Sequence, residues 1–156
     1  MRVFRFFLDT SALFAGIWSA RGGARLLLRL GETGKVRLLV SRRVLWELET
    51  AFSRKAPDLL PDIARLLHLV DIEIAPDPSP ETIRRVLAWK VPPGDAEVLA
   101  AALEARPDFF VTLDRKHFLN RPDLSSRIPF PIGTPGDAVQ WWRDRALSQG
   151  TPSENV

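Results

Sequence analysis

A length of 156 residues suits a single domain with one core, and 46% of the residues are hydrophobic, as in ordinary globular proteins. No apolar stretch approaches the roughly 18 residues that a membrane-spanning helix needs, and the absence of cysteine excludes disulfides, thiolate zinc sites and cysteine nucleophiles. The formal net charge of +3 is small, but basic residues recur in adjacent pairs, so charge leaves open both a solvated basic face and binding to a nucleic acid.

The first half of the chain alternates apolar strands with helices. Residues 3–8 are apolar almost throughout, as in a strand that is buried on both faces. Asp9 interrupts this run too early for the apolar core of a signal peptide, so we expect a cytoplasmic protein. Thr10 or Ser11 can cap a short helix that ends at Trp18. Further helices are predicted at 24–30, 42–55 and 61–69, and strands at 36–40 and 71–75.

The second half continues this alternation after a proline-rich loop. Helices are predicted at 81–89, 95–106, 114–119 and 135–146, and strands at 108–112 and 129–132. Repeated strand–helix units predict a three-layer α/β/α fold around a central, mostly parallel sheet of four to five strands. A single domain over residues 1–147 accounts for these elements, and the polar residues 148–156 are expected to form a disordered tail.

Four acidic residues follow predicted strands or open predicted helices. Asp9 follows the first strand, Asp114 follows the strand at 108–112, Glu47 lies in the helix after the second strand, and Asp95 opens an apolar helix. Because the carboxyl ends of parallel strands meet at one edge of a sheet, these acids can share one pocket. Carboxylates that lie close together repel each other unless a cation joins them. The pattern therefore predicts a metal site, and with only two histidines in the chain its ligands must be mainly oxygen, which favours Mg²⁺ or Mn²⁺.

Each acid also has a simpler explanation. Asp9 and Asp114 are suited to capping a helix, Asp95 can complement a helix dipole, and a helical glutamate is usually a surface residue. Glu47 and Glu49 flank the apolar arc of their helix on opposite sides, so periodicity does not choose between them. The metal hypothesis rests on the coincidence of all four acids at one edge.

Four segments together resemble the PIN-domain ribonucleases. They are residues 8–13 (LDTSAL), 41–48 (SRRVLWEL), 94–102 (GDAEVLAAA) and 111–118 (VTLDRKHF). The resemblance implies a metal-dependent endonuclease that acts on single-stranded or looped RNA. It also favours Glu47 over Glu49. Many small prokaryotic members are toxins of type II toxin–antitoxin pairs, similar to VapC, so it further implies a homodimer and an antitoxin partner.

The residues expected to carry catalysis and to bind Mg²⁺ or Mn²⁺ are Asp9, Glu47, Asp95 and Asp114. Hydroxyl groups expected to support a metal ligand or a phosphate belong to Thr10, Ser11 and Thr112. Candidates for contact with RNA are Arg42, Arg43, Arg115, Lys116 and His117. Many family members carry a further acid two residues after the aspartate of the fourth segment. This chain has Lys116 there, which is compatible with a one-metal arrangement.

Two other functions fit part of the pattern. An aspartyl-phosphate phosphatase or phosphotransferase also places an aspartate after the first strand. Such sites usually need a second acid two residues on, where this chain has Ser11. A non-catalytic module of the same fold could bind RNA or a protein through its basic rim, and an activity assay decides between that module and an enzyme.

Overall fold

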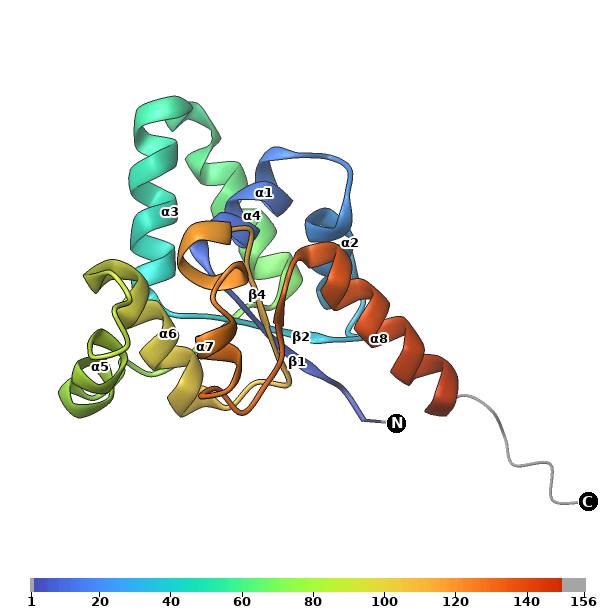
Figure 1. Ribbon diagram of the computed structural model, residues 1–156. Coiled ribbons are helices and arrows are strands. Elements are labelled where there is room, and N and C mark those ends of the chain that lie inside the picture. Colours follow the sequence, from blue (N-terminus) through green and yellow to red (C-terminus); the bar gives the residue numbers. More distant parts are fainter. Residues whose placement is uncertain (1, 150–156) are drawn as a thin grey trace, which may run out of the picture.

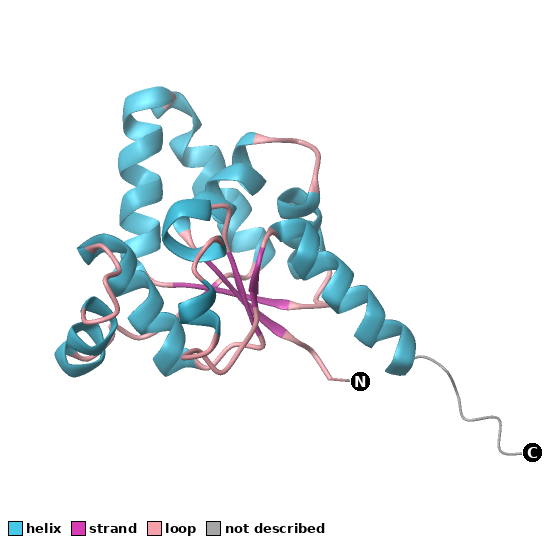
Figure 2. Ribbon diagram, in the orientation of Figure 1, coloured by secondary structure: helices cyan, strands magenta, loops and turns pink. Residues whose placement is uncertain are grey.

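The computed structural model describes residues 2–149 and is built around a sheet of five parallel strands (Figure 1). The strands are β1 (Arg5–Leu8), β2 (Arg37–Val40), β3 (Glu73–Ile74), β4 (Phe109–Val111) and β5 (Ile132–Gly133). Their order across the sheet is β3-β2-β1-β4-β5, and every neighbouring pair is parallel. Helices lie on both sides of the sheet (Figure 2). The predicted three-layer α/β/α fold is confirmed.

Eight α-helices connect or follow these strands in the described part of the chain. They are α1 (Thr10–Trp18), α2 (Gly23–Glu32), α3 (Arg42–Lys55), α4 (Leu60–Val70), α5 (Pro80–Leu87), α6 (Pro93–Ala105), α7 (Pro122–Ser125) and α8 (Pro135–Gln149). Two short helical turns add η1 (Pro57–Leu59) and η2 (Arg115–Leu119). None of the described helices is long and apolar enough to cross a membrane.

Several element boundaries differ from the predicted ones because proline suits the first turn of a helix, where its missing N–H is not needed. Accordingly α5 begins at Pro80 and α6 at Pro93, each earlier than predicted. The same preference explains α7, a short helix at Pro122 that was not predicted. The last helix runs to Gln149, into the predicted tail, and residues 150–156 of that tail lie outside the described residues.

The two faces of the sheet are packed by different aromatic side chains. On one face Trp141 of α8 makes edge contacts with Phe6 and Phe109, at ring-centroid distances of 5.7 Å each. The opposite face carries Phe7 and Phe110, because successive side chains of a strand alternate; these two rings stack at 5.8 Å. The predicted burial of the first strand on both faces is confirmed, since Phe6, Phe7 and Leu8 are fully buried.

The strand order determines where a site can form. From β1 the chain moves to β2 and β3 on one side, and then crosses to β4 and β5 on the other side. The direction of winding therefore reverses between β1 and β4. At such a switch point the loops leaving the two carboxyl ends separate, which opens a crevice above the sheet. The segments that follow β1 and β4 form the wall of that crevice.

Candidate metal centre

Asp9 and Thr112 lie side by side at the carboxyl ends of the two central strands. Leu8 and Val111 are paired in the sheet, and the backbone N–H of Asp9 donates to the carbonyl of Val111 at 3.1 Å. One residue further along each strand therefore places the Asp9 carboxylate beside the Thr112 hydroxyl, which donates to Asp9 Oδ2. Asp114 follows two residues later, and its backbone N–H donates to Thr112 Oγ1 at 3.0 Å. Adjacent strands thus bring together two acids that are distant in sequence.

Asp9 is the most buried of the acids, with 6% of its surface exposed. It is the N-cap of α1, rather than Thr10 or Ser11, because its Oδ1 accepts the N–H of Ala12 at 2.9 Å. The Ser11 hydroxyl donates to the same oxygen at 2.6 Å. Burial raises the pKa of Asp9 from 3.8 to about 6, although these hydrogen bonds lower it and the nearby charge of Asp114 raises it. Asp9 therefore serves as a cap and also faces the crevice.

Glu47 reaches the same crevice from α3. Ser41 caps α3 immediately after β2, so the helix starts at the carboxyl edge of the sheet. Glu47 Oε2 accepts the Thr10 hydroxyl at 2.6 Å, and its Oε1 accepts Nε of Arg43, one turn earlier, at 2.8 Å. Helix α6 approaches closely at Gly94, where an added Cβ would lie 3.1 Å from Arg43 Nη2 and 3.6 Å from Glu47 Oε1. Glu47 is thereby held between α1 and α6.

Asp95 and Asp114 are linked through one histidine. Asp114 Oδ2 lies 2.8 Å from Nδ1 of His117, and Asp95 Oδ2 lies 3.4 Å from the same nitrogen. Asp114 also caps η2, since its Oδ1 accepts the His117 N–H at 3.0 Å. Burial raises the pKa of Asp95; the neighbouring His117 lowers it, and the charges of Asp114 and Glu47 raise it further. Arg43 also lowers it, so Asp95 lies between two carboxylates and two basic side chains.

The four predicted acids line one hollow of about 580 Å³. The same hollow is lined by Thr10 and Ser11 and, further out, by Phe14 of α1 and Lys55 of α3. Phe14 and Lys55 were not among the predicted site residues. Their helical spacing could have revealed them, because Phe14 follows Thr10 by four residues and Lys55 follows Glu47 by eight.

The predicted RNA-contacting residues are distributed differently. Arg43 is bound to Glu47 and also pairs with Glu97 at 3.4 Å, and His117 lies within the acid cluster. Arg42 is exposed and pairs with Asp77 at 3.5 Å, away from the acids. Arg115 and Lys116 are exposed and make no ion pair with any of the described residues. Among the five predicted RNA contacts, all of which lie in the described part of the chain, only Arg115 and Lys116 are exposed basic residues without an ion pair, and they directly follow Asp114 in sequence.

The donor set consists mainly of carboxylate oxygens, which suit a hard divalent cation such as Mg²⁺ or Mn²⁺. One ligand atom from each of Asp95, Asp114 and His117 lies within 4.8 Å of the others. Asp9 Oδ2 accepts one hydrogen bond, from Thr112, and so keeps a second lone pair for a cation. Among the described residues Arg43 forms an ion pair with Glu47, His117 contacts Asp95 and Asp114 through Nδ1, and Asp9 has neither kind of contact. The cluster is therefore short of positive charge.

Known proteins resemble this chain both in sequence profile and in fold. The profile of the PIN domain family matches residues 5–116, whereas no curated protein sequence matches the chain. Among solved structures, the chain resembles a chain in the crystal structure of VapBC2 from Rickettsia felis, in which VapBC2 is bound to a DNA fragment from its promoter. The TM-score is 0.62 with 18% identity, over 83% of this chain and 98% of that chain.

A second solved structure that resembles the chain is Mycobacterium tuberculosis VapC20, a Sarcin-Ricin loop cleaving toxin. The TM-score is 0.49 with 17% identity, over 74% of this chain and 94% of that chain. The family profile covers well over half of the chain and includes Asp9, Glu47, Asp95 and Asp114. The chain belongs to the PIN domain family, as its sequence predicted.

Proposed function

We propose that this protein is a metal-dependent endoribonuclease that hydrolyses phosphodiester bonds of RNA. The observation that carries the proposal is the convergence of Asp9, Glu47, Asp95 and Asp114 on one hollow. They come from four separate segments and meet at the switch point of a parallel sheet, where α/β proteins bind ligands. Capping explains Asp9 and Asp114 individually, but it does not explain why Glu47 and Asp95 face the same space.

The cofactor we propose is Mg²⁺ or Mn²⁺, held by Asp9, Asp95 and Asp114, with Glu47 as a further ligand or as the group that orients water. A cation bound there would acidify water and neutralise the charge that builds up on the scissile phosphate. The hydroxyls of Thr10, Ser11 and Thr112 fix the acids in place, because each donates to Asp9 or Glu47. Hydrolysis by attack of water needs no 2′-hydroxyl, so we expect 5′-phosphate and 3′-hydroxyl products.

The charges around the hollow suit a polyanionic substrate. Arg115 and Lys116 are exposed directly after Asp114, and they are the predicted RNA contacts best placed to bind the backbone of a strand entering the hollow. Arg43 and His117 are proposed instead to position Glu47, Asp95 and Asp114, since they already contact those carboxylates. For Arg42, which pairs with Asp77, the structure offers no contact near the acids.

We further propose that the protein is the toxin of a toxin–antitoxin pair and acts in the cytoplasm as a homodimer. The support is the PIN family profile together with the likeness in fold to the VapBC2 structure. An antitoxin would then inhibit the enzyme by covering the acidic hollow, for which an arginine side chain is chemically suited. Light scattering of the purified protein tests the homodimer directly.

The phosphotransferase alternative finds no support in the geometry of Asp9. Such sites usually need a second acid two residues after the aspartate, where this chain has Ser11. The Ser11 hydroxyl instead donates to Asp9 Oδ1 at 2.6 Å. The residues around Asp9 therefore favour a metal ligand over a phosphorylated nucleophile.

The proposal is tested by cleavage of a single-stranded RNA by the purified protein with Mg²⁺ or Mn²⁺, and again with EDTA. We expect cleavage that EDTA abolishes, and no cleavage by Asp9→Asn or Asp95→Asn. Both variants should remain folded by circular dichroism. Metal should also raise the melting temperature of the parent, because a ligand that binds only the folded state stabilises it. Cleavage by Asp95→Asn at the parental rate would overturn the assignment.

A further inference from the structure

The acidic hollow continues outward into a region of different chemistry. Besides the acids, the hollow is lined by Phe14, one helical turn beyond Thr10 on α1, and by Lys55, two turns beyond Glu47 on α3. Lys55 is the one basic residue among the described residues that line the hollow. Its Nζ lies 5.2 Å from the centroid of the Phe14 ring, and no described carboxylate forms an ion pair with it. The Lys55 ammonium therefore lies over the Phe14 ring and can bind an anion in the hollow.

Two helices align this outer region with the acids. Thr10, Phe14 and Trp18 follow one another at intervals of four residues along α1, and Glu47 and Lys55 are two such intervals apart on α3. Thr10 hydrogen-bonds Glu47 at the inner end, and Phe14 contacts Lys55 at the outer end. Eight residues of α-helix rise about 12 Å. Lys55 therefore lies about 12 Å along α3 from Glu47, at the end of the hollow away from the acidic cluster.

Trp18 extends this outer region into solvent. Its ring stacks on Phe14, with centroids 5.8 Å apart and an interplanar angle of 16°. Phe14 in turn stacks on the fully buried Phe52 at 4.9 Å. Trp18 is nevertheless 56% exposed, although it is the largest apolar side chain of α1. Trp18 also contacts Phe52, with ring centroids 5.9 Å apart. The indole therefore packs on two other rings while much of its surface stays uncovered.

We propose that Trp18, Phe14 and Lys55 form a nucleotide subsite, in which the exposed indole stacks on an unpaired base and Lys55 binds the adjoining phosphate. The subsite rests on the proposed RNase function and specifies its substrate: a strand with an unstacked base near the cleaved bond. Stacking on an aromatic ring tolerates any base, and a lysine contacts phosphate without reading sequence. The subsite therefore selects single-stranded or looped RNA without selecting a base.

The test measures binding of a fluorescent single-stranded RNA by full-length protein in the cleavage-deficient Asp95→Asn background. Trp18→Ala should weaken binding roughly tenfold or more, whereas Trp18→Phe keeps a ring and should retain most of the affinity. Lys55→Gln should lower the slope of log affinity against log salt by about 0.7, the value expected for one lost phosphate contact with a single strand. Leu69→Ala and Arg65→Gln are matched controls, because both residues are exposed on α4 outside the hollow.

A second arm identifies the stacked base. Removing the stacked base from the oligonucleotide, at a position near the mapped cleavage site, should weaken its binding to the Asp95→Asn protein. In the Asp95→Asn protein that also carries Trp18→Ala, the oligonucleotide without that base and the intact oligonucleotide should bind equally well. In the cleavage-competent protein, Trp18→Ala and Lys55→Gln should mainly raise KM and leave kcat within a few-fold. That division separates a binding subsite from a general loss of structure.

The outcomes separate this subsite from the RNase function itself. If the parent cleaves RNA but Trp18→Ala and Lys55→Gln bind and cleave like the controls, the subsite is wrong and the nuclease stands. If the parent neither binds nor cleaves RNA, both proposals fail. If Trp18→Ala changes only the oligomeric state measured by light scattering, the indole is a protein contact and the subsite is overturned.

Discussion

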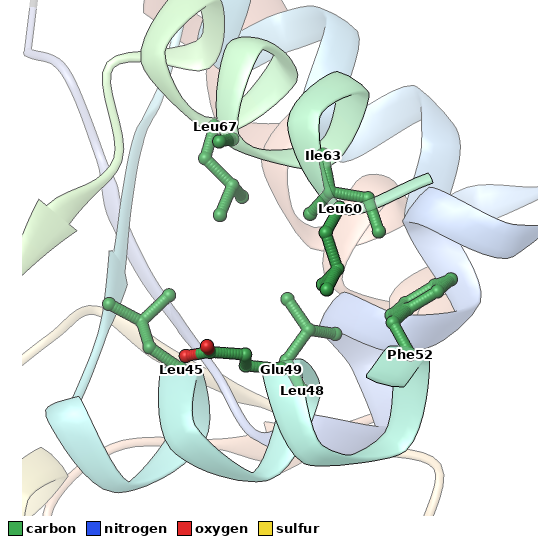
Figure 3. Close-up of a pocket in the computed structure, with 8 residues that line it drawn as sticks. Leu45, Leu48, Glu49, Phe52, Leu60, Ile63 and Leu67 are labelled. Atoms are coloured by element: carbon green, nitrogen blue, oxygen red, sulfur yellow. The ribbon is translucent and has the colours of Figure 1, made fainter. Parts of the chain in front are cut away.

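Helix α3 separates two hollows of opposite chemistry. On one side lies the acidic hollow, to which α3 contributes Glu47, Ala51 and Lys55. On the other side lies an apolar hollow of about 320 Å³ between α3 and α4 (Figure 3). Its lining residues are Leu45, Leu48, Glu49, Phe52, Leu60, Ile63, Ala64 and Leu67. In Figure 3 the leucines and Phe52 of α3 face the leucines and Ile63 of α4.

The difference shows how one helix can serve both the site and the core. Glu47 and Glu49 are two residues apart and therefore point about 200° apart around the helix axis. Glu47 accepts hydrogen bonds from Thr10 and Arg43 and lines the same hollow as three aspartates. Glu49 is exposed and lies at the edge of the apolar hollow. The acidic hollow carries repulsion that a cation would relieve, and the apolar hollow gains stability from buried surface. Changes on the two sides of α3 should accordingly affect different properties.

Removing the same charge from each hollow should have very different effects on catalysis. Glu47→Gln should reduce metal-dependent cleavage about 100-fold or more, because the amide can neither bind a cation well nor orient water. Glu49→Gln should keep the parental rate. Cleavage rates under saturating metal measure both variants. Equal losses in the two variants, or none in Glu47→Gln, would contradict the assignment of Glu47.

A truncation on the apolar side should affect stability rather than catalysis. Leu48 is 2% exposed and faces α4, so Leu48→Ala removes buried methyl groups beside an existing hollow. We expect a loss of about 2–4 kcal/mol in the free energy of unfolding. Urea denaturation measures it, with Leu69→Ala as a control because Leu69 is 58% exposed. A loss below 1 kcal/mol in Leu48→Ala would show that the α3–α4 contact contributes little.

Some of the acids in the hollow could be predicted from local sequence pattern alone, and others could not. Asp9 and Asp114 were predictable as neighbours because each closely follows a strand, and parallel strands end at the same edge. Periodicity alone could not choose Glu47 over Glu49, since both flank the apolar arc of α3. The fold makes that distinction, because α1 and α6 pack on the Glu47 side and α4 on the other.

Other features depended on contacts that local pattern does not encode. His117 was predicted to touch RNA, but η2 turns its ring back toward Asp114 and across to Asp95, 22 positions earlier in the chain. Such a long-range contact follows from packing and not from spacing. By contrast, the pairing of Arg43 with Glu47 was available from their i,i+4 separation. The catalytic and metal-binding roles of the four acids remain predictions.

Neutralising Asp9, the most buried of the four acids, should change the stability of the metal-free protein. Because the folded-state pKa of Asp9 is raised from 3.8 to about 6, folding favours its protonated form. Metal-free protein should therefore lose stability as pH rises from about 4 through 6 and stay at the lower value above that. Asp9→Asn avoids this penalty and should be about 1–3 kcal/mol more stable than the parent at pH 7.5, but not at pH 4.

Unfolding in EDTA at both pH values measures that difference, and added Mg²⁺ or Mn²⁺ supplies the control. Metal should stabilise the parent and leave Asp9→Asn nearly unchanged, so that the order of stability narrows or reverses. If Asp9→Asn were less stable than the parent at pH 7.5 in EDTA, the capping hydrogen bonds of Asp9 would outweigh its burial. The charged Asp9 carboxylate would then stabilise the metal-free fold and not destabilise it.

The smallest expected effect comes from filling the apolar hollow. Ala64 lies on α4 at the edge of that hollow, so Ala64→Leu adds apolar atoms where space already exists. We expect a gain of up to about 1 kcal/mol in the free energy of unfolding, since the added surface is only partly buried. Cleavage activity should not change, because the substitution lies across α3 from the acids. A loss of stability would mean that the leucines of α3 and α4 leave no room for the side chain, and a loss of activity would mean that α3 transmits packing changes from one hollow to the other.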